Sequence, residues 1–294
     1  MKRVSFNFLT IIILLFPLYT FAQDTTETNE EWKWHWEDVG DWIDWWKKKP
    51  SISVYYGFSS ISREDVEAPF ADNNLVELKL GYTSKNTTRF ANYIERRRNK
   101  YFVINYNSTK LAGGSGTSSD IETNNWRLGL GSSSGYGYKL GKDASITPFF
   151  ASSMDWTNIN FKNDSLGSND ERIAQLYDET FRFGSSNDMG VHIQATRLIT
   201  LQASYERAIV YERHLFWKWA GSGIIELAAH GLLDVFIKEI LKSTPAAGPV
   251  VFFILKSALG YGLYELRQEK MNWPFSSAPP IAFDNIKFGV TFVF

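Results

Sequence analysis

Residues 286–294 read IKFGVTFVF, and large apolar side chains occupy every second position of this segment. The apolar positions are Ile286, Phe288, Val290, Phe292 and Phe294, and the positions between them include Lys287, Gly289 and Thr291. Successive side chains of a β-strand point to opposite faces of the sheet. The period of two therefore predicts a strand with one apolar face and one polar face.

Seven further segments show the same alternation, so we expect eight strands in all. Val76, Leu78 and Leu80, for example, alternate with Glu77 and Lys79. The expected strands cover residues 51–61, 74–84, 100–110, 125–140, 144–161, 179–196, 198–212 and 285–294. Each is long enough for a tilted strand to cross a bilayer, which takes about 9–11 residues, and single-chain bacterial barrels have even strand numbers. The sequence predicts an all-β fold, an eight-stranded antiparallel transmembrane β-barrel over residues 51–294.

The connections between these strands alternate in part between tight turns and long loops. Residues 141–143 and Arg197 mark tight turns, whereas residues 111–123 and 162–178 are rich in Asn, Ser and Gly and mark long loops. Short turns on the periplasmic side and longer loops outside are typical of outer-membrane barrels. The connection over residues 85–99 is expected on the periplasmic side, and it is longer than the short turns that are usual there.

The N-terminus has the three parts of a secretory signal peptide. Lys2 and Arg3 precede a 12-residue apolar run, Phe8 to Tyr19, which is too short to span a bilayer, and small residues precede Gln23. We therefore expect a signal peptide over residues 1–22, with an uncleaved anchor as the alternative, and export to a Gram-negative outer membrane.

The overall composition limits the possible functions and fits an envelope protein. The chain has no cysteine, which excludes disulfides and a lipid-modified N-terminal cysteine, and a formal charge of −1 offers no footprint for nucleic acid. Its 11 Trp, 14 Tyr and 22 Phe residues suit a protein with two water–lipid boundaries.

The polar face of the strands indicates which side points inward. In a water-soluble sandwich or lipocalin-like barrel, the apolar face would point inward instead. Here glycines accompany charges on the polar face, as in Lys79 with Gly81 and Arg127 with Gly129. A narrow lumen needs small residues beside charged ones, so we expect the polar face to line a lumen closed by mixed charges. The expected lumen network is Glu77, Lys79, Arg127, Arg182, His192, Glu206 and Lys287.

The chain end carries a second signature, made by Lys287, Gly289, Phe292 and Phe294. This spacing resembles the C-terminal recognition signal of outer-membrane barrels, and the whole pattern resembles small barrels of the OmpA/OmpX type. The resemblance implies an outer-membrane location and recognition by the barrel-assembly machinery, through an exposed last strand that pairs edge-on. It implies no activity.

A tryptophan-rich segment precedes the first strand. We expect residues 23–50 to form a flexible lead followed by an amphipathic helix, because Trp32, Trp36, Trp42 and Trp46 fall on one helical stripe opposite charged residues. Such a helix suits the periplasmic membrane interface. The alternative is a helix that covers the periplasmic mouth of the barrel.

A long insertion, residues 213–284, separates the last two strands and is too long to lack structure. We expect helices over residues 222–241 and 249–267, which together form a helical hairpin within residues 221–268. The hairpin can plug the lumen, cap the mouth or lie on the outer leaflet, or serve as a partner site. The apolar residues available for burial on the first helix are Ile225, Leu232, Val235, Phe236 and Ile240.

One polar row on the first helix offers the best place for chemistry. Glu226, His230, Asp234 and Lys238 are spaced by four, so they share one helical face. Glu226, His230 and Asp234 are weak candidates for proton transfer or metal binding. A solvated or lumen-facing stripe with pairing between neighbouring turns is favoured, because helical metalloprotease motifs contain two histidines.

These patterns favour a non-enzymatic outer-membrane barrel that acts as a scaffold, a surface-contact protein or a narrow conduit. The sequence has no nucleophile elbow, P-loop, dinucleotide fingerprint or calcium loop, so we expect no metal or cofactor. One alternative is an enzyme that modifies lipid, because outer-membrane lipid A palmitoyltransferases have a similar architecture. The other is a small-solute channel gated by the hairpin. The expected partners are outer-membrane lipid, the barrel-assembly machinery and an envelope protein bound by the hairpin or the Trp-rich helix.

Overall fold

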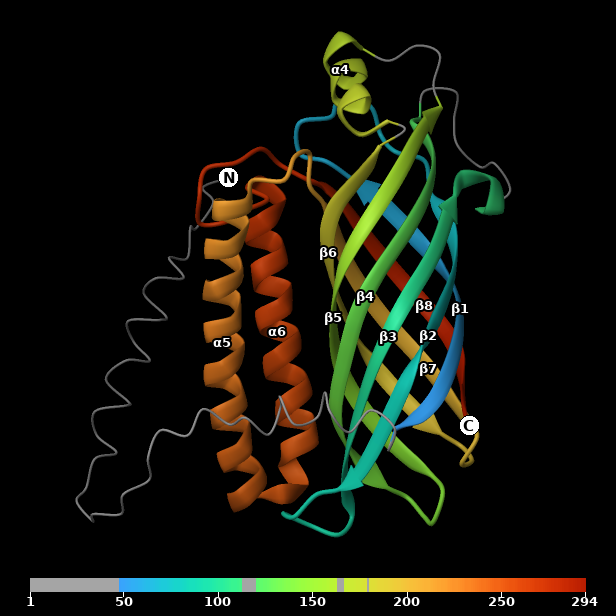
Figure 1. Ribbon diagram of the computed structural model, residues 1–294, viewed down its shortest axis with the longest axis vertical. Helices are drawn as coiled ribbons and strands as arrows, with labels where there is room; N and C mark the ends of the chain where they lie inside the picture. Colours follow the sequence, from blue (N-terminus) through green and yellow to red (C-terminus); the bar gives the residue numbers. More distant parts are fainter. Residues whose placement is uncertain (1–47, 113–119, 163–166, 179) are drawn as a thin grey trace, which may run out of the picture. The chain divides into compact units, whose positions relative to one another are not determined.

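Eight antiparallel strands close into a barrel in a computed structural model that describes residues 48–112, 120–162, 167–178 and 180–294 (Figure 1). Every strand pairs with its neighbours in the sequence, and the last strand pairs with the first. This confirms the predicted eight-stranded barrel. The strands are β1 (Lys49–Ser62), β2 (Asn73–Thr87), β3 (Ile94–Ser108), β4 (Glu122–Lys139), β5 (Ser145–Lys162), β6 (Phe181–Gln194), β7 (Ile199–Val210) and β8 (Ile281–Val293).

The predictions for residues 1–47 lie outside the described residues. They are the signal peptide, the flexible lead and the helix with Trp32, Trp36, Trp42 and Trp46.

The polar face of each strand lines the lumen, and the apolar face points outward, as the alternation predicts. Glu77 in the lumen is completely buried, whereas Tyr56 and Leu130 on the outer wall are 47% and 61% exposed. Side chains that would form the core of a soluble protein therefore cover the outside of this barrel.

The second and third strands are longer than expected, and only residues 88–93 connect them. Most residues that resemble a polar loop in the sequence belong to these two strands, and alternate positions among them, such as Glu95 and Arg97, face the lumen. Glu95 pairs with Lys85 at 2.8 Å, and Arg97 donates a hydrogen bond to Thr200 across the lumen at 3.1 Å. The expected long connection over 85–99 is therefore wrong, because charged residues in this strand have partners inside the barrel.

The two ends of the barrel differ. We call the end with connections 88–93, 140–144 and 195–198 the turn end, and the opposite end the loop end. At the loop end, the segment expected to be a long loop contains the helix α4 (Ser168–Tyr177). Side chains of α4, including Ile173, pack with inward-facing apolar residues of the strands, among them Ile61 and Phe283. An apolar core therefore closes the lumen at this end.

A polar contact reinforces that closure. Arg63 donates a hydrogen bond of 2.6 Å to the hydroxyl of Tyr177 and another of 3.0 Å to Glu212. Burial raises the pKa of Tyr177, although Arg63 acts in the opposite direction, so the phenol stays protonated and uncharged.

The helical hairpin lies against the outside of the barrel (Figure 1). It consists of α5 (Phe216–Ser243), a 3₁₀ turn η3 (Pro245–Ala247) and α6 (Gly248–Glu269). Phe252 of α6 packs on outward-facing residues of the wall, among them Tyr136 and Phe150. The expectation that the hairpin plugs the lumen or caps the mouth is therefore wrong. Strand side chains already fill the lumen, and α4 covers the loop end.

The buried face of α5 is also the reverse of the one expected. Leu232, Val235 and Phe236 are more than half exposed, and Ile225 is 36% exposed, whereas Ser222 and Ile237 are buried. Ile240 is half-buried. The expectation that the large apolar residues of this helix are buried is wrong because its polar row faces α6.

Candidate functional site

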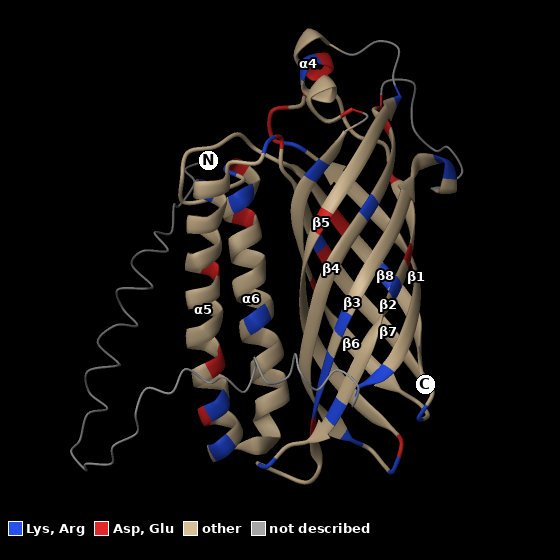
Figure 2. Cartoon of the chain, in the orientation of Figure 1, with Lys and Arg blue, Asp and Glu red and all other residues tan. Residues whose placement is uncertain are grey.

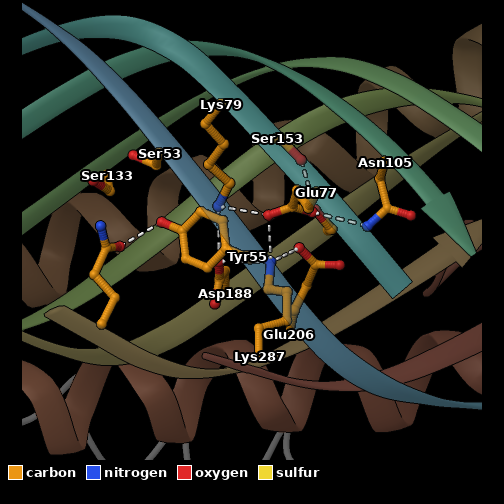
Figure 3. Close-up of polar contacts among 12 residues, drawn as sticks. Ser53, Tyr55, Glu77, Lys79, Asn105, Ser133, Ser153, Asp188, Glu206 and Lys287 are labelled. Atoms are coloured by element: carbon orange, nitrogen blue, oxygen red, sulfur yellow. Dashed lines mark hydrogen bonds and ion pairs between the residues drawn. The ribbon is translucent and has the colours of Figure 1, made fainter. Parts of the chain in front are cut away.

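Six charged side chains meet in the middle of the lumen, and together we call them the lumen cluster. Figure 3 labels Glu77, Lys79, Asp188, Glu206 and Lys287 among them. Lys287 of β8 lies at its centre. Its ammonium is 2.9 Å from Glu77 of β2 and 3.0 Å from Asp188 of β6, and it also contacts Glu206 of β7. The lumen cluster therefore joins strands from opposite sides of the barrel. Its members are Glu77, Lys79, Arg127, Asp188, Glu206 and Lys287.

The other two cations complete a balanced network. Lys79 lies 3.0 Å from Asp188 and 3.3 Å from Glu77, with its ammonium over the rings of Tyr55 and Tyr101. Arg127 lies 3.1 Å from Glu77 and contacts Glu206. Three carboxylates and three cations cancel in charge, and mutual pairing offsets the cost of removing them from water.

The three carboxylates also have the spacing of a metal site. Oxygens of Glu77, Asp188 and Glu206 lie within 4.8 Å of one another. The ammonium of Lys287 lies among them and contacts all three. In this arrangement the protein's own cation balances the carboxylates, at the position that a metal ion would need.

The lumen network predicted from the sequence assembles in part. The network joins, as expected, Glu77, Lys79, Arg127, Glu206 and Lys287. Asp188 was not predicted, and it joins them from the polar face of β6 that it shares with His192. Arg182 lies apart, at the loop end, where it donates a hydrogen bond to the carbonyl of Leu176. The expectation that it joins the network is wrong, because the backbone of α4 provides its partner.

His192 lies in the lumen, as its strand position predicts, nearer the turn end than the lumen cluster. Its ring stacks on Phe149 with the ring centres 4.0 Å apart. Both residues line a cavity of about 20 Å³ together with Tyr55 and Lys79, and a second cavity of about 10 Å³ lies on the Arg127 side. Cavities of this size hold one or two water molecules. Within the described residues, the lumen is a packed interior.

A second polar cluster joins the two helices of the hairpin, and we call it the hairpin seam. Lys256 of α6 lies 2.8 Å from Asp234 and 3.3 Å from Nδ1 of His230, and Arg267 lies 2.8 Å from Glu226. Arg267 also donates a hydrogen bond of 3.0 Å to Ser222.

The hairpin seam contains most of the polar row of α5. Glu226, His230 and Asp234, the candidate catalytic residues, all contact cations of α6. Lys238, the last of the row, is half-buried. His230 and Glu226 are 3.9 Å apart, and the His230 ring packs near Phe150 on the barrel wall. Through Glu226, His230 and Asp234 the row joins α5 to α6 and does not face the lumen, while the side chain of Asp234 stays 53% exposed.

The barrel wall also makes an ionic contact with α6. Arg207 points outward from β7, yet it is only 8% exposed because α6 covers it. Its guanidinium lies 2.7 Å from Glu265 of α6 and 2.9 Å from Asp284 of β8. The ring of Tyr264 lies 4.1 Å from it. This contact could not be predicted from the sequence, because an arginine at an outward position of a strand does not reveal what covers it.

The residues of the proposed assembly signal lie on both faces of β8. Lys287 and Gly289 face the lumen, whereas Phe292 and Phe294 are 42% and 64% exposed. β8 is paired on both sides, with β7 and with β1. Recognition of these residues by an assembly machinery stays a prediction.

Comparisons with known proteins give structural similarity without a sequence family. No protein-family model and no curated protein matches the chain. Among solved structures, Neisserial surface protein A is similar at 9% identity and a TM-score of 0.37, over 83% of this chain and 97% of that one. Ail of Yersinia pestis is similar at 7% identity and a TM-score of 0.29, over 84% and 99%. OprG of Pseudomonas aeruginosa is similar at 11% identity and a TM-score of 0.30, over 84% and 97%.

Proposed function

We propose that this chain is a non-enzymatic barrel of the bacterial outer membrane that holds a membrane-embedded helical hairpin as a scaffold for contacts within the envelope. The observation that carries the proposal is shared by the barrel and the hairpin: each has apolar side chains on its outside and charged side chains on its inside. Most large apolar side chains lie on the outer wall of the barrel and the outer face of α5, whereas the lumen cluster and the hairpin seam hold ionised side chains on the inside of each part.

The outer wall has the aromatic girdle of a membrane barrel. Tyr106 and Trp126 of neighbouring strands pack with ring centres 4.7 Å apart, and Trp156 and Phe183 lie 5.6 Å apart on the next pair. These rings occupy the loop-end side of the apolar wall, where amphipathic rings suit a headgroup region.

The hairpin has the length and polarity to lie beside the barrel in the bilayer. Trp217 and Leu227 of α5 are 83% and 74% exposed. From Trp217 to Phe236 the helix rises about 28 Å, which compares with a hydrocarbon thickness of about 30 Å. Residues Pro245–Glu269 form a helix long and apolar enough to span a membrane. Exposed leucines and tryptophans are expensive in water but favourable in lipid.

The alternative functions have less support. A solute channel needs a path through the lumen, but the lumen cluster and the apolar core under α4 occupy it. A lipid-modifying enzyme needs a free acid or base, but the candidates Glu226, His230 and Asp234 contact cations of α6. The hairpin fits a scaffold better, because its polar groups serve internal contacts.

The proposal also includes a route by which the chain reaches the outer membrane. The signal peptide directs export, the chain end through Phe294 binds the assembly machinery, and the Trp-rich helix adds a contact at the periplasmic interface. An envelope protein that docks on the hairpin is the expected partner.

Membrane insertion tests the proposal directly. The mature chain, residues 23–294, is refolded with vesicles of uncharged phosphatidylcholine and analysed on gels with and without heating. We expect it to float with the vesicles, to migrate faster unheated than heated, and to produce no conductance steps in planar bilayers. A monodisperse protein in buffer without detergent would refute the membrane location, and regular conductance steps would refute the closed lumen.

A further inference from the structure

Arg97 of β3 carries a positive charge in the lumen, on the turn-end side of the lumen cluster. The residue is only 3% exposed. Its guanidinium donates a hydrogen bond of 3.1 Å to the uncharged hydroxyl of Thr200, and its Nε has no hydrogen-bond partner. The nearest acidic residue on the same strand face, Glu95, lies 2.8 Å from Lys85. Within the described residues, Arg97 therefore forms no ion pair.

The other charges of the lumen do not balance Arg97. The three cations of the lumen cluster pair with its three carboxylates. Asp155 lines the second cavity, on the Arg127 side of the cluster, and it accepts a hydrogen bond of 2.9 Å from the hydroxyl of Ser153. A buried carboxyl group can bind a proton and become neutral, whereas arginine stays charged in proteins. Because an unpaired buried charge is costly, Arg97 requires an anion of its own.

The larger of the two lumen cavities, about 20 Å³, lies beside Arg97, and we call it the turn-end cavity. Asn99, the next lumen-facing residue after Arg97 on β3, lines it. Gln202, the next lumen-facing residue after Thr200 on β7, lines it as well. His192, a third lining residue, is close enough to Arg97 to interact with it electrostatically. Figure 3 labels further lining residues, which are Ser53, Tyr55, Lys79 and Ser133.

The lining of the turn-end cavity suits an anion better than a cation. Lys79 is among the described residues that line it, and no Asp or Glu is. Oγ1 of Thr83 and Nδ1 of His192 lack hydrogen-bond partners, and these residues are 6% and 3% exposed. A threonine hydroxyl donates a hydrogen bond, and so does Nδ1 in one tautomer of a neutral imidazole. Oδ1 of Asn99 also lacks a partner, but the hydroxyl of Ser133 that bonds this amide accepts or donates, so the amide can turn its nitrogen toward the cavity.

We infer that the turn-end cavity binds one small inorganic anion, such as chloride, held by the guanidinium of Arg97, the hydroxyl of Thr83 and Nδ1 of His192. A chloride ion is little larger than a water molecule, so it fits a cavity of about 20 Å³. The anion balances Arg97, and each donor gains a charge-assisted hydrogen bond. Basic residues gather toward the turn end of the barrel (Figure 2), and their potential favours the entry of anions there. The inference goes beyond the proposed function and does not depend on it, because all of these groups lie inside the barrel.

Bromide, which replaces chloride in such sites, shows directly whether an anion occupies the cavity. Crystals of the mature chain in detergent are grown with sodium bromide as the only halide and measured at the bromine absorption edge. We expect an anomalous peak inside the barrel, within hydrogen-bonding distance of Arg97 and Thr83. A turn-end cavity that holds only water, or bromide confined to the outer surface, would overturn the inference.

Chloride should also stabilise the folded chain through this site. Urea unfolding of the chain in uncharged detergent micelles is compared in sodium chloride and in sodium gluconate at equal concentrations, because gluconate is too large for the cavity. Chloride at about ten times its dissociation constant should raise the folding equilibrium constant about tenfold. Equal unfolding midpoints in the two salts throughout a titration would overturn the inference.

Two matched variants separate this site from a general effect of salt. Arg97→Gln removes the charge that the anion balances, so its unfolding midpoint should be the same in both salts. Lys142→Gln removes the same charge from an exposed turn and should keep the full effect of chloride. A chloride effect that persists in Arg97→Gln, or that disappears equally in Lys142→Gln, would overturn the inference.

A third variant tests the site without changing its charge. If Arg97→Gln does not fold, Thr83→Val takes its place, because it removes one donor and keeps the shape of the side chain. This variant should bind bromide more weakly and gain less stability from chloride, and an unchanged response to both ions would overturn the inference. A chain that proved soluble without detergent would refute the proposed membrane location, and the same measurements in buffer would still test the anion site.

Discussion

Gly260 of α6 lies against the ring of Phe150 on β5, so closely that a Cβ atom at position 260 would be 2.7 Å from Cε2 of that ring. Real Cβ contacts are essentially never this short. The missing side chain lets the helix approach the barrel wall, and it places Lys256 and Arg267 of the same helix face against α5. Gly260 therefore permits the close approach of α6 to the barrel wall at this point.

A larger residue at this position should displace the hairpin. We expect Gly260→Val to lower the free energy of unfolding by about 1–3 kcal/mol through overpacking against Phe150. The control is Gly262→Val on the same helix, where an added Cβ has open space around it. Protease digestion of folded protein in vesicles should cut the hairpin faster only in the first variant. Equal digestion of both variants would show that the contact does not hold α6.

Removal of one charge from the lumen cluster should destabilise the barrel. Lys287→Met leaves Glu77, Asp188 and Glu206 without their common cation in a buried site. Breaking a buried pair in this way costs about 3–5 kcal/mol. Urea unfolding in phosphatidylcholine vesicles measures the loss, with Lys142→Met in an exposed turn as the control. A midpoint equal to that of the control would mean that water reaches the cluster freely.

Gly289 should be needed for packing as well as for any recognition signal. A Cβ atom at this position would clash with Cδ1 of Tyr55 and would lie 2.7 Å from the carbonyl oxygen of Val54. We expect Gly289→Ala to lower the yield of refolding into vesicles in the absence of any assembly machinery. Gly141→Ala, with open space at its Cβ position, should refold normally. Normal refolding of Gly289→Ala would instead assign this glycine to recognition alone.

The direction of the hairpin can be mapped by cysteine labelling, because the chain has no cysteine of its own. Ser276 lies in the loop-end connection and Thr244 in the turn between the helices. In intact cells a membrane-impermeant maleimide should label Ser276→Cys, and it should label Thr244→Cys only after the outer membrane is permeabilised. Leu227→Cys, on the exposed face of α5, should resist labelling in both conditions. Labelling of Thr244→Cys in intact cells would contradict a hairpin that follows the barrel through the membrane.

The strand pattern could be predicted because a strand repeats its environment every two residues. Ile52 and Val54 face outward, whereas Ser51 and Ser53, which alternate with them, are buried, as the pattern indicates. The start of β3 was misplaced because Glu95 and Arg97 are polar in sequence but have partners across the lumen. A local pattern cannot show that a charge has a distant partner.

Local periodicity is enough to predict the eight strands, their inward and outward faces and the existence of two helices before the last strand. The place of the hairpin and the direction in which α5 faces depend instead on contacts between residues far apart in the chain. Glu226 and Arg267, like Lys287 and Glu77, are distant in the chain, and their pairing depends on how the barrel closes and on the surface it leaves for the helices. The polar row of α5 faces α6, because ionised groups need partners wherever water is excluded.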